Sequence, residues 1–304
     1  MPLLRRLRRV PRLVRTGSVR ARDFAQYVAY TRGADAHERA FFNLSVDFEL
    51  GWSVGHRTAN ERTRRVAKER ARRARATFPA LLDLCDELSL PVTIACVAHL
   101  ALPTCTHRQP PAFAAYDGDP LRKEPGALSW YGGDLIERLL QSSAGHEIAS
   151  HGFAHIDLAL ADEEVARFEL EESRAILQPI ARDITTFVFP KNHVSHLALV
   201  REAGYTIYRS PRNEPIAEED GLWRFPHGLW LSPASSTRRE YRRAVTRAVE
   251  RRTLANFYFH LHEFRSGDSF RRFTEPILRQ VARHRAAGDL EVATMRGIVN
   301  ALAR

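Results

Sequence analysis

The chain has 304 residues, of which 44% are hydrophobic and 27% are charged. This is the composition of a globular protein, and it excludes a disordered chain, a collagen-like repeat and a disulfide-rich scaffold. The net charge is +10, but ten arginines against three acidic residues in the first 40 positions account for most of it. Because the remainder is nearly balanced, we expect no nucleic acid among its partners.

Residues 1–39 are predicted to be a basic N-terminal segment in front of a single large domain, residues 40–304. Apolar side chains recur there at helical spacing between the arginines, at Leu3, Leu4, Leu7, Val10, Leu13 and Val14. Such a helix could contact an anionic membrane peripherally; the alternatives are a basic tail or a helix packed on the body, and Pro11 interrupts a continuous helix. Neither a secretory signal nor a membrane span is found, so the predicted location is cytoplasmic.

Short apolar runs alternate with helical patterns along the rest of the chain. Strands are predicted at residues 40–48, 91–97, 147–150, 185–189, 205–208, 256–261 and 290–293. Helices are predicted at residues 60–88, 133–141, 162–177, 195–203 and 237–253, and after the last strand. This alternation predicts an α/β fold, a distorted (β/α) barrel of about seven parallel strands. In such barrels the chemistry takes place at the carboxyl ends of the strands.

Two long stretches, residues 102–131 and 210–236, are rich in proline or glycine and interrupt the alternation. Loops of this length are uncommon unless they are functional or disordered. We therefore expect both to contribute substrate contacts, the first as a lid over the site and the second through Trp223 and Trp230. The three cysteines, Cys85, Cys96 and Cys105, fit neither a zinc ribbon nor a redox pair and are predicted to be reduced and mostly buried.

Ionisable residues follow three of the predicted strands. Asp47 and Glu49 lie two positions apart at the end of the first strand, so both side chains point to one side in an extended chain. His151 and His155 follow strand 147–150, and one helical turn would place both imidazoles on one face, as a divalent metal requires. Either pair alone could be structural, whereas both together at neighbouring strand ends predict a metal site.

A further group, His260, His262 and Glu263, ends strand 256–261 and supplies an imidazole for acid or base chemistry. Taken in order, the segments SVDFE, SHGFAH, FVFP and FHLHE resemble the motifs of the polysaccharide deacetylase (NodB homology) family, carbohydrate esterase family 4. The resemblance extends over residues 41–303 and is greatest to the branch with an Asp-x-Glu first motif. It implies a distorted (β/α) barrel that hydrolyses N-acetyl groups or other C–N bonds with a divalent metal, most often zinc.

The resemblance assigns Asp47 as the catalytic base and Glu49, His151 and His155 as metal ligands. It assigns the general acid to His260, with His262 as the alternative. The family's third motif has an arginine two residues before a proline, but this chain has Val188 there. Lys191 or Asn192 could supply the missing polar contact; the alternative is that they belong to a plain surface loop. The residues expected to bind substrate are Pro190, Lys191, Asn192, Trp223 and Trp230.

The donor types agree with this assignment. Two neutral imidazoles and one carboxylate leave positions on a metal for a water and for the amide oxygen. Asp47 would then remove the proton from the water, and His260, held protonated with help from Glu263, would protonate the departing amine. The predicted function is N-deacetylation of an amino sugar in a glycan or glycan precursor. Two alternatives remain: a hydrolase of non-sugar amides, imides or ureides, and a metal-binding pseudoenzyme.

Overall fold

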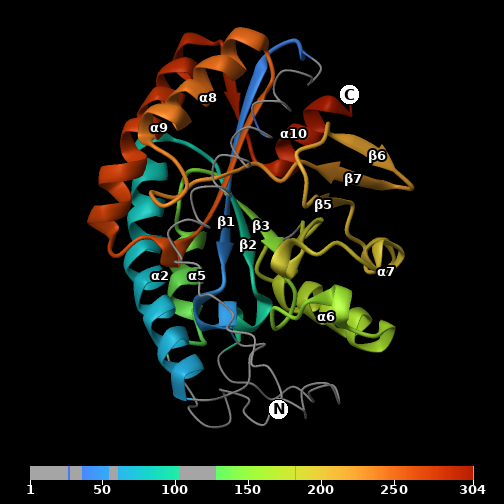
Figure 1. The fold of residues 1–304 in the computed structure, drawn as a ribbon. Helices are drawn as coiled ribbons and strands as arrows, with labels where there is room; N and C mark the ends of the chain where they lie inside the picture. The colour runs from blue at the N-terminus through green and yellow to red at the C-terminus, as the bar shows by residue number, and fades with distance from the viewer. Residues whose placement is uncertain (1–26, 28–35, 55–60, 103–127, 182, 304) are drawn as a thin grey trace, which may run out of the picture.

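The computed structural model describes residues 27, 36–54, 61–102, 128–181 and 183–303. One ten-stranded sheet forms the centre of the molecule, and helices cover its outer side (Figure 1). Most of segment 1–39 and of stretch 102–131 lies outside the described residues, and so do the expected N-terminal helix, the expected lid and Cys105. No helix in the described part of the chain has the length and apolarity needed to span a bilayer.

The strands alternate with helices in nearly the order that the sequence predicts. The strands are β1 (Ala40–Phe48), β2 (Thr93–Cys96), β3 (Glu147–Ser150), β4 (Thr186–Val188), β5 (Ile207–Arg209), β6 (Ala217–Glu219), β7 (Leu222–Phe225), β8 (Leu229–Trp230), β9 (Leu254–His260) and β10 (Leu290–Val292). The α-helices are α2 (Glu61–Leu88), α5 (Gly133–Leu140), α6 (Glu163–Leu177), α7 (Leu197–Glu202), α8 (Arg238–Arg251), α9 (Gly267–Ala287) and α10 (Met295–Leu302). Short 3₁₀ helices include η1 (Leu50–Val54), η4 (Pro190–Asn192) and η5 (Leu261–Glu263).

The sheet is parallel except at one edge. Its strand order is β6-β7-β5-β4-β3-β2-β1-β9-β8, with β10 beside β1, and only β6 and β7 pair antiparallel. Among the described strands β6 and β8 form the two edges, so the sheet curls into a partial barrel without a closed ring of hydrogen bonds. The predicted distorted (β/α) barrel is thereby confirmed, with more strands than the seven expected.

Strand β1 is the centre of the sheet, and all nine of its residues are buried. It pairs with β9 along one side and with β10 and then β2 along the other. A strand covered on both faces is expected to be mainly apolar, and six of the nine residues of β1 are. The other three, Asn43, Ser45 and Asp47, are buried polar residues at alternate positions, so they point to the same face of the sheet. In this pairing Asp47 lies opposite His260, so two of the expected catalytic residues are neighbours across the ladder.

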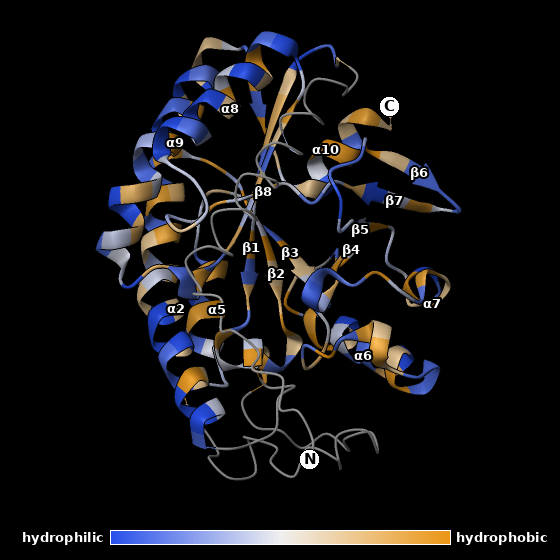
Figure 2. Cartoon of the chain, viewed as in Figure 1, coloured by the Kyte–Doolittle hydropathy of each residue, from blue (hydrophilic) through white to orange (hydrophobic). Residues whose placement is uncertain are grey.

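Helices α2, α8 and α9 cover one side of the barrel, apolar toward the sheet and polar toward solvent (Figure 2). Small and aromatic side chains of α2 face inward, and the Phe78 ring stacks on Phe48 of β1 with 4.4 Å between centroids. Cys85 and Cys96 are free, buried thiols, as expected, and burial raises the pKa of Cys85, and that of Cys96 to about 12.

Three strands and one helix were not expected. Helix α9 has a proline at position 276, which masks its pattern, although Ser266 and Ser269 form a capping box and apolar residues recur every three or four positions from Phe270. The stretch 210–236, expected to be irregular, contains the β6–β7 hairpin and β8. These strands are short and only partly buried, so they lack the buried apolar run that indicates the equally short β2 and β4.

Candidate active site

The carboxyl ends of the central strands bring together the residues that the motifs single out. Asp47 and His260 lie opposite each other at the ends of β1 and β9, and His260 Nε2 is 3.5 Å from Asp47 Oδ2. The same nitrogen is 3.7 Å from Glu49 Oε1. Asp47 and Glu49 are almost fully buried, so their charges interact strongly with neighbouring groups.

Glu49 joins the first strand end to the third. Its Oε1 atom lies 3.2 Å from His151 Nε2 and 3.0 Å from His155 Nε2. The candidate ligand atoms of these three residues all lie within 4.8 Å of one another, and every one of the three side chains is buried. A second overlapping group joins Asp47, Glu49 and His260. The carboxylate of Glu49 is common to both groups.

The two histidines approach each other through a turn, which corrects the expected helical arrangement. After β3 the chain is not helical: Gly152 has φ of +78° and His155 has φ of +61°. The two imidazole centroids are 4.8 Å apart. Left-handed backbone at a non-glycine residue is costly and is retained where the surroundings impose it, as at binding sites.

The buried Glu169 of α6 supports this turn and was not found from the sequence. Its carboxylate accepts hydrogen bonds from the backbone N–H groups of Phe153 and Ala154, at 2.9 and 3.1 Å. Burial raises the pKa of Glu169 to about 7, against the opposing effect of these backbone donors. Nothing around Glu169 in the sequence marks it, since it lies within an ordinary amphipathic helix.

The protonation states suit a divalent metal. Burial lowers the pKa of His155 to about 4, so its imidazole is neutral near pH 7. Burial alone would raise the pKa of Glu49, but the imidazoles of His155 and His260 outweigh it and hold that pKa well below its usual range. His151 Nδ1–H donates to the Val188 carbonyl oxygen at 2.7 Å, so Nε2 is the nitrogen that faces Glu49 and the candidate metal position. Two imidazole nitrogens and one carboxylate therefore fit a zinc-type site with open positions.

Arg209, at the end of β5, forms the principal contact of Asp47. Its NH1 and NH2 groups donate to Asp47 Oδ1 and Oδ2 at 2.7 and 2.8 Å, a bidentate pair in the buried interior. Although burial would raise the pKa of Asp47, this guanidinium holds it far below its usual range, so the carboxylate is ionised. Each oxygen keeps a lone pair for a water molecule.

Arg209 lies at the level where the third motif has its arginine, but on the neighbouring strand. In the β4–β5 ladder Arg209 lies opposite Val188, the residue that stands where the motif has arginine. The guanidinium thus enters the site from the neighbouring strand at the same level. Asn192, one of the two expected replacements, accepts a hydrogen bond from Arg209 NH2 at 3.0 Å, so it contacts the arginine and not the base.

The charge of His260 is set by the surrounding carboxylates. Burial lowers its pKa, but Glu49, Glu263 and Asp47 outweigh burial and raise it to about 9, so the imidazole is protonated at neutral pH. Glu263 Oε1 lies 3.3 Å from His260 Nδ1. Burial and the charge of His260 instead lower the pKa of His262 to about 3. Of the two candidate acids, His260 has both the proton and the position beside Asp47.

The expected substrate-binding residues are brought to this region with one exception. Trp230 Nε1–H donates to Glu263 Oε1 at 2.8 Å, beside His260. Pro190 is buried at the start of η4, and Lys191 Nζ donates to the Ser53 carbonyl oxygen at 3.2 Å. Trp223 lies elsewhere: it packs on a separate cluster in which Ile207, Phe225 and Met295 take part.

Several solved structures share this arrangement of strands and helices. A putative polysaccharide deacetylase from Mycobacterium smegmatis matches with a TM-score of 0.58 at 18% identity, over 87% of this chain and 90% of that one. The chain has the polysaccharide deacetylase fold. A probable polysaccharide deacetylase from Pseudomonas aeruginosa PAO1 shares this fold, with a TM-score of 0.56, 14% identity and coverage of 86% and 89%.

The deacetylase fold is also that of the Puue allantoinase, which matches with a TM-score of 0.53 at 14% identity and the same coverage of 86% and 89%. No protein-family model matches this sequence, and neither does any curated protein. Identities this low relate the folds, whereas the Asp-x-Glu branch and the roles of individual residues stay predictions. The site of this deacetylase fold is therefore interpreted from its own residues.

Proposed function

We propose that the protein is a metal-dependent deacetylase that hydrolyses the N-acetyl group of an amino sugar. The observation that carries the proposal is the convergence of four strand ends, which places an ionised carboxylate, a protonated histidine and three candidate metal ligands within one buried cluster. The likeness of the fold to structures described as polysaccharide deacetylases supports it. An amino sugar in a glycan or glycan precursor is the proposed substrate.

Glu49, His151 and His155 would hold the metal, with zinc as the ion that best suits these donors. When bound, a divalent ion supplies Lewis acidity to the amide carbonyl and lowers the pKa of water. Asp47, held by Arg209, accepts one proton from the attacking water as the water oxygen bonds to the carbonyl carbon. Arg209 keeps the carboxylate oriented during this transfer.

His260 donates its proton to the sugar nitrogen as the C–N bond breaks, because an unprotonated amine is a poor leaving group. The products are acetic acid and a free amine, so one water is consumed for each acetyl group. The proton on Asp47 returns through solvent to His260. Glu263 keeps the imidazole in its protonated, donating form.

The test is acetate release from a panel of N-acetylated sugars by zinc-loaded protein. Asp47→Asn and chelator-treated protein should both lose at least about a thousandfold in rate, since one lacks the base and the other the metal. A tightly bound metal without release from any sugar would contradict the proposal. A ureide or imide included in the panel tests the alternative hydrolase, which the allantoinase among the neighbours keeps in consideration.

A further inference from the structure

A pocket of about 650 Å³ lies directly beside the candidate acid. Its lining includes Arg65, Arg70 and Arg73 of α2, and Trp230, His262 and Glu263 around the end of β9. Glu263 connects it to the site, because one of its carboxylate oxygens contacts both His260 and the Trp230 indole. A substrate whose amide lies at the candidate site could therefore place another of its groups in this pocket, on the far side of His260.

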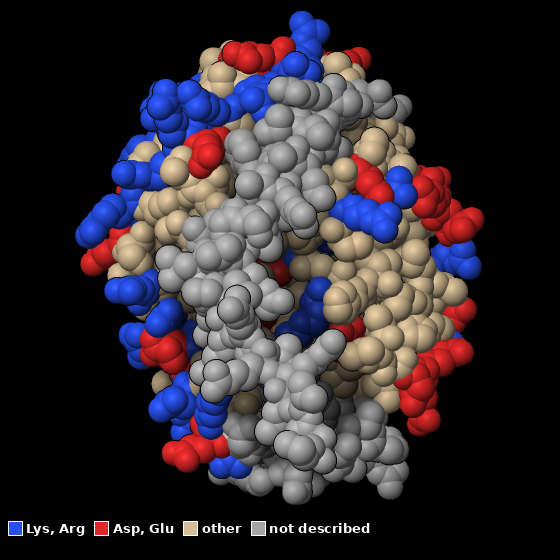
Figure 3. Space-filling view, in the orientation of Figure 1, with Lys and Arg blue, Asp and Glu red and all other residues tan. Residues whose placement is uncertain are grey.

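The wall formed by α2 is strongly basic. Eight arginine or lysine residues and two glutamates lie between Glu61 and Arg75, and this run covers the first half of the helix. The residues of α2 that line the pocket recur at helical spacing, at Arg65, Val66, Glu69, Arg70 and Arg73, so one helix face is turned toward it. Basic side chains also gather over α2 in the space-filling view (Figure 3).

The carboxylates in this wall are already engaged. Glu69 binds Arg72 and Arg73 at 2.9 and 2.7 Å, and Glu263 binds Trp230. Arg65 is exposed and has no carboxylate partner among the described residues. Arg70 NH1 donates to Ser53 Oγ at 3.1 Å, which anchors this arginine to η1, the turn that follows Glu49. The pocket therefore presents guanidinium groups close to the reacting end of the site.

We propose that the substrate is an N-acetylated amino sugar carrying a phosphoryl group, and that Arg65, Arg70 and Arg73 bind this group. The inference rests on the proposed deacetylase function. Planar guanidinium groups recognise phosphoryl oxygens in pairs, whereas a neutral oligosaccharide offers them no charge. Trp230 supplies a flat apolar surface for the sugar, and the volume is within the range of small-molecule pockets.

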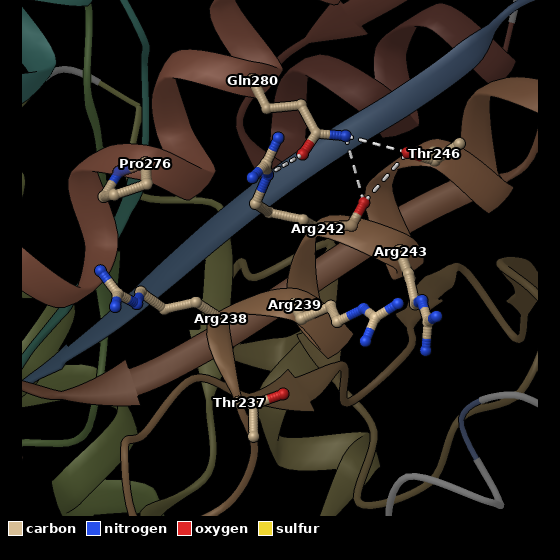
Figure 4. A pocket seen from close by; sticks show the side chains of 8 residues that line it. All are labelled: Thr237, Arg238, Arg239, Arg242, Arg243, Thr246, Pro276 and Gln280. Carbon is tan, nitrogen blue, oxygen red and sulfur yellow. Dashed lines mark hydrogen bonds between the residues drawn. The ribbon is translucent and has the colours of Figure 1, made fainter.

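A second arginine-rich pocket provides the control. It lies against α8 and α9, has a volume of about 610 Å³ and is lined by four arginines of α8, at positions 238, 239, 242 and 243 (Figure 4). None of the candidate catalytic or metal-binding residues lines it. Arg242 is held there by Gln280, at 2.9 Å. Arg239 is exposed on its helix like Arg65, so Arg239→Gln removes the same charge away from the site.

The experiment compares kcat/KM for N-acetylglucosamine, its 1-phosphate and its uridine diphosphate ester. We expect the phosphorylated substrates to be preferred at least about tenfold, and Arg65→Gln to remove most of that preference through KM. The double variant Arg65→Gln/Arg73→Gln should lose the rest of the preference for phosphorylated substrates. The control Arg239→Gln should leave kcat/KM unchanged for all three sugars. Comparing the 1-phosphate with the uridine diphosphate ester shows whether the arginines bind a sugar phosphate or a nucleotide sugar. Raising the salt concentration should weaken the preference for the phosphorylated substrates.

Equal kcat/KM for neutral and phosphorylated sugars would overturn the proposal while leaving the deacetylase intact, as would equal effects of Arg65→Gln and Arg239→Gln. If no sugar is deacetylated, calorimetric binding of the 1-phosphate to the Asp47→Asn protein decides the matter. If the Asp47→Asn protein binds the 1-phosphate and the Asp47→Asn/Arg65→Gln protein does not, the phosphoryl-binding site is supported even though the deacetylase function is not. Absence of binding would remove the site as well.

Discussion

Arg209 is the residue on which the state of Asp47 most directly depends. Both carboxylate oxygens of Asp47 accept from its guanidinium, and the Tyr258 ring lies over the guanidinium at 5.0 Å. A buried pair of this kind is stabilising only while both partners are present, because removing one leaves an uncompensated charge. The arginine therefore both orients the Asp47 carboxylate, the candidate base, and compensates its charge in the interior.

Arg209→Lys should lower kcat on the order of a hundredfold and leave KM nearly unchanged. A lysine keeps the charge but cannot bind both oxygens of Asp47, so the carboxylate loses its orientation. Steady-state kinetics measure the two constants, and Arg212→Lys, three residues on and exposed, is the matched control. An unchanged kcat would show that Arg209 has no part in positioning the base.

Arg209→Met should in addition destabilise the protein by about 3–5 kcal/mol, since Asp47 is then buried and unpaired. Urea unfolding measures the free energy. The same substitution in an Asp47→Asn background should cost much less, because no buried charge is left. Equal losses in the two backgrounds would contradict the assigned ion pair.

Glu263→Gln should move the alkaline limb of the activity profile to lower pH. His260 acts as an acid only while protonated, and its pKa of about 9 is raised in part by the Glu263 carboxylate. Without that charge the imidazole loses its proton at a lower pH, so kcat/KM should begin to fall earlier as pH rises. The pH profile tests this, with the exposed Glu137→Gln as control; an unmoved limb would exclude His260 as the titrating acid.

At the scale of elements, the turn between β3 and α6 determines whether His151 and His155 meet. Gly152 has a φ that other residues rarely adopt, and a Cβ there would lie 2.8 Å from the Glu169 carboxylate. The turn depends on this carboxylate, which accepts the N–H groups of Phe153 and Ala154. The candidate metal site thus depends on a strand end and on a buried helix residue together.

Gly152→Ala should reduce zinc affinity by about 10–100-fold, because the turn must shift away from Glu169 and with it the ligands. Competition with a fluorescent zinc chelator measures the affinity. Gly145→Ala is the matched control: its φ is +75°, but a Cβ there would contact nothing within 4 Å. If both variants bind zinc equally well, the Glu169-supported turn does not position the ligands.

At the scale of the whole molecule, a residue of the N-terminal segment belongs to the core. Tyr27 is 1% exposed, its ring lies beside Phe257, and its hydroxyl accepts the backbone N–H of Asn256 at 3.3 Å. The division into residues 1–39 and 40–304 stays a prediction, and Tyr27 offers a direct test of it.

A chain lacking residues 1–39 should be less stable than a chain lacking residues 1–26, by about 3 kcal/mol or more in the free energy of unfolding. The longer truncation removes Tyr27, which leaves a cavity against Phe257 and an unpaired buried N–H. Urea unfolding compares the two, and Tyr27→Ala in the full chain should reproduce this loss. Equal stability of the two truncated chains would place the boundary where the sequence predicts it.

The sequence determined most of the fold, because the central strands are buried and mainly apolar and alternate with amphipathic helices. The bounds of β1 and β3 agree with the predicted 40–48 and 147–150. The sequence did not predict β6, β7, β8 or the proline-containing α9, because these three strands are short and only partly buried and Pro276 interrupts the helical pattern. The candidate ligands Glu49, His151 and His155 could be named in advance because each directly follows a strand.

The tertiary structure alone decided what surrounds those residues. Arg209 reaches Asp47 because β4 and β5 pair with Val188 opposite Arg209, a register that neither strand encodes by itself. Glu169 reaches the turn that holds His151 and His155 from a helix, and Trp223, expected to contact substrate, packs on a separate hydrophobic cluster. Local sequence specifies which residues end a strand, whereas contacts between residues far apart in the chain depend on how the strands and helices pack.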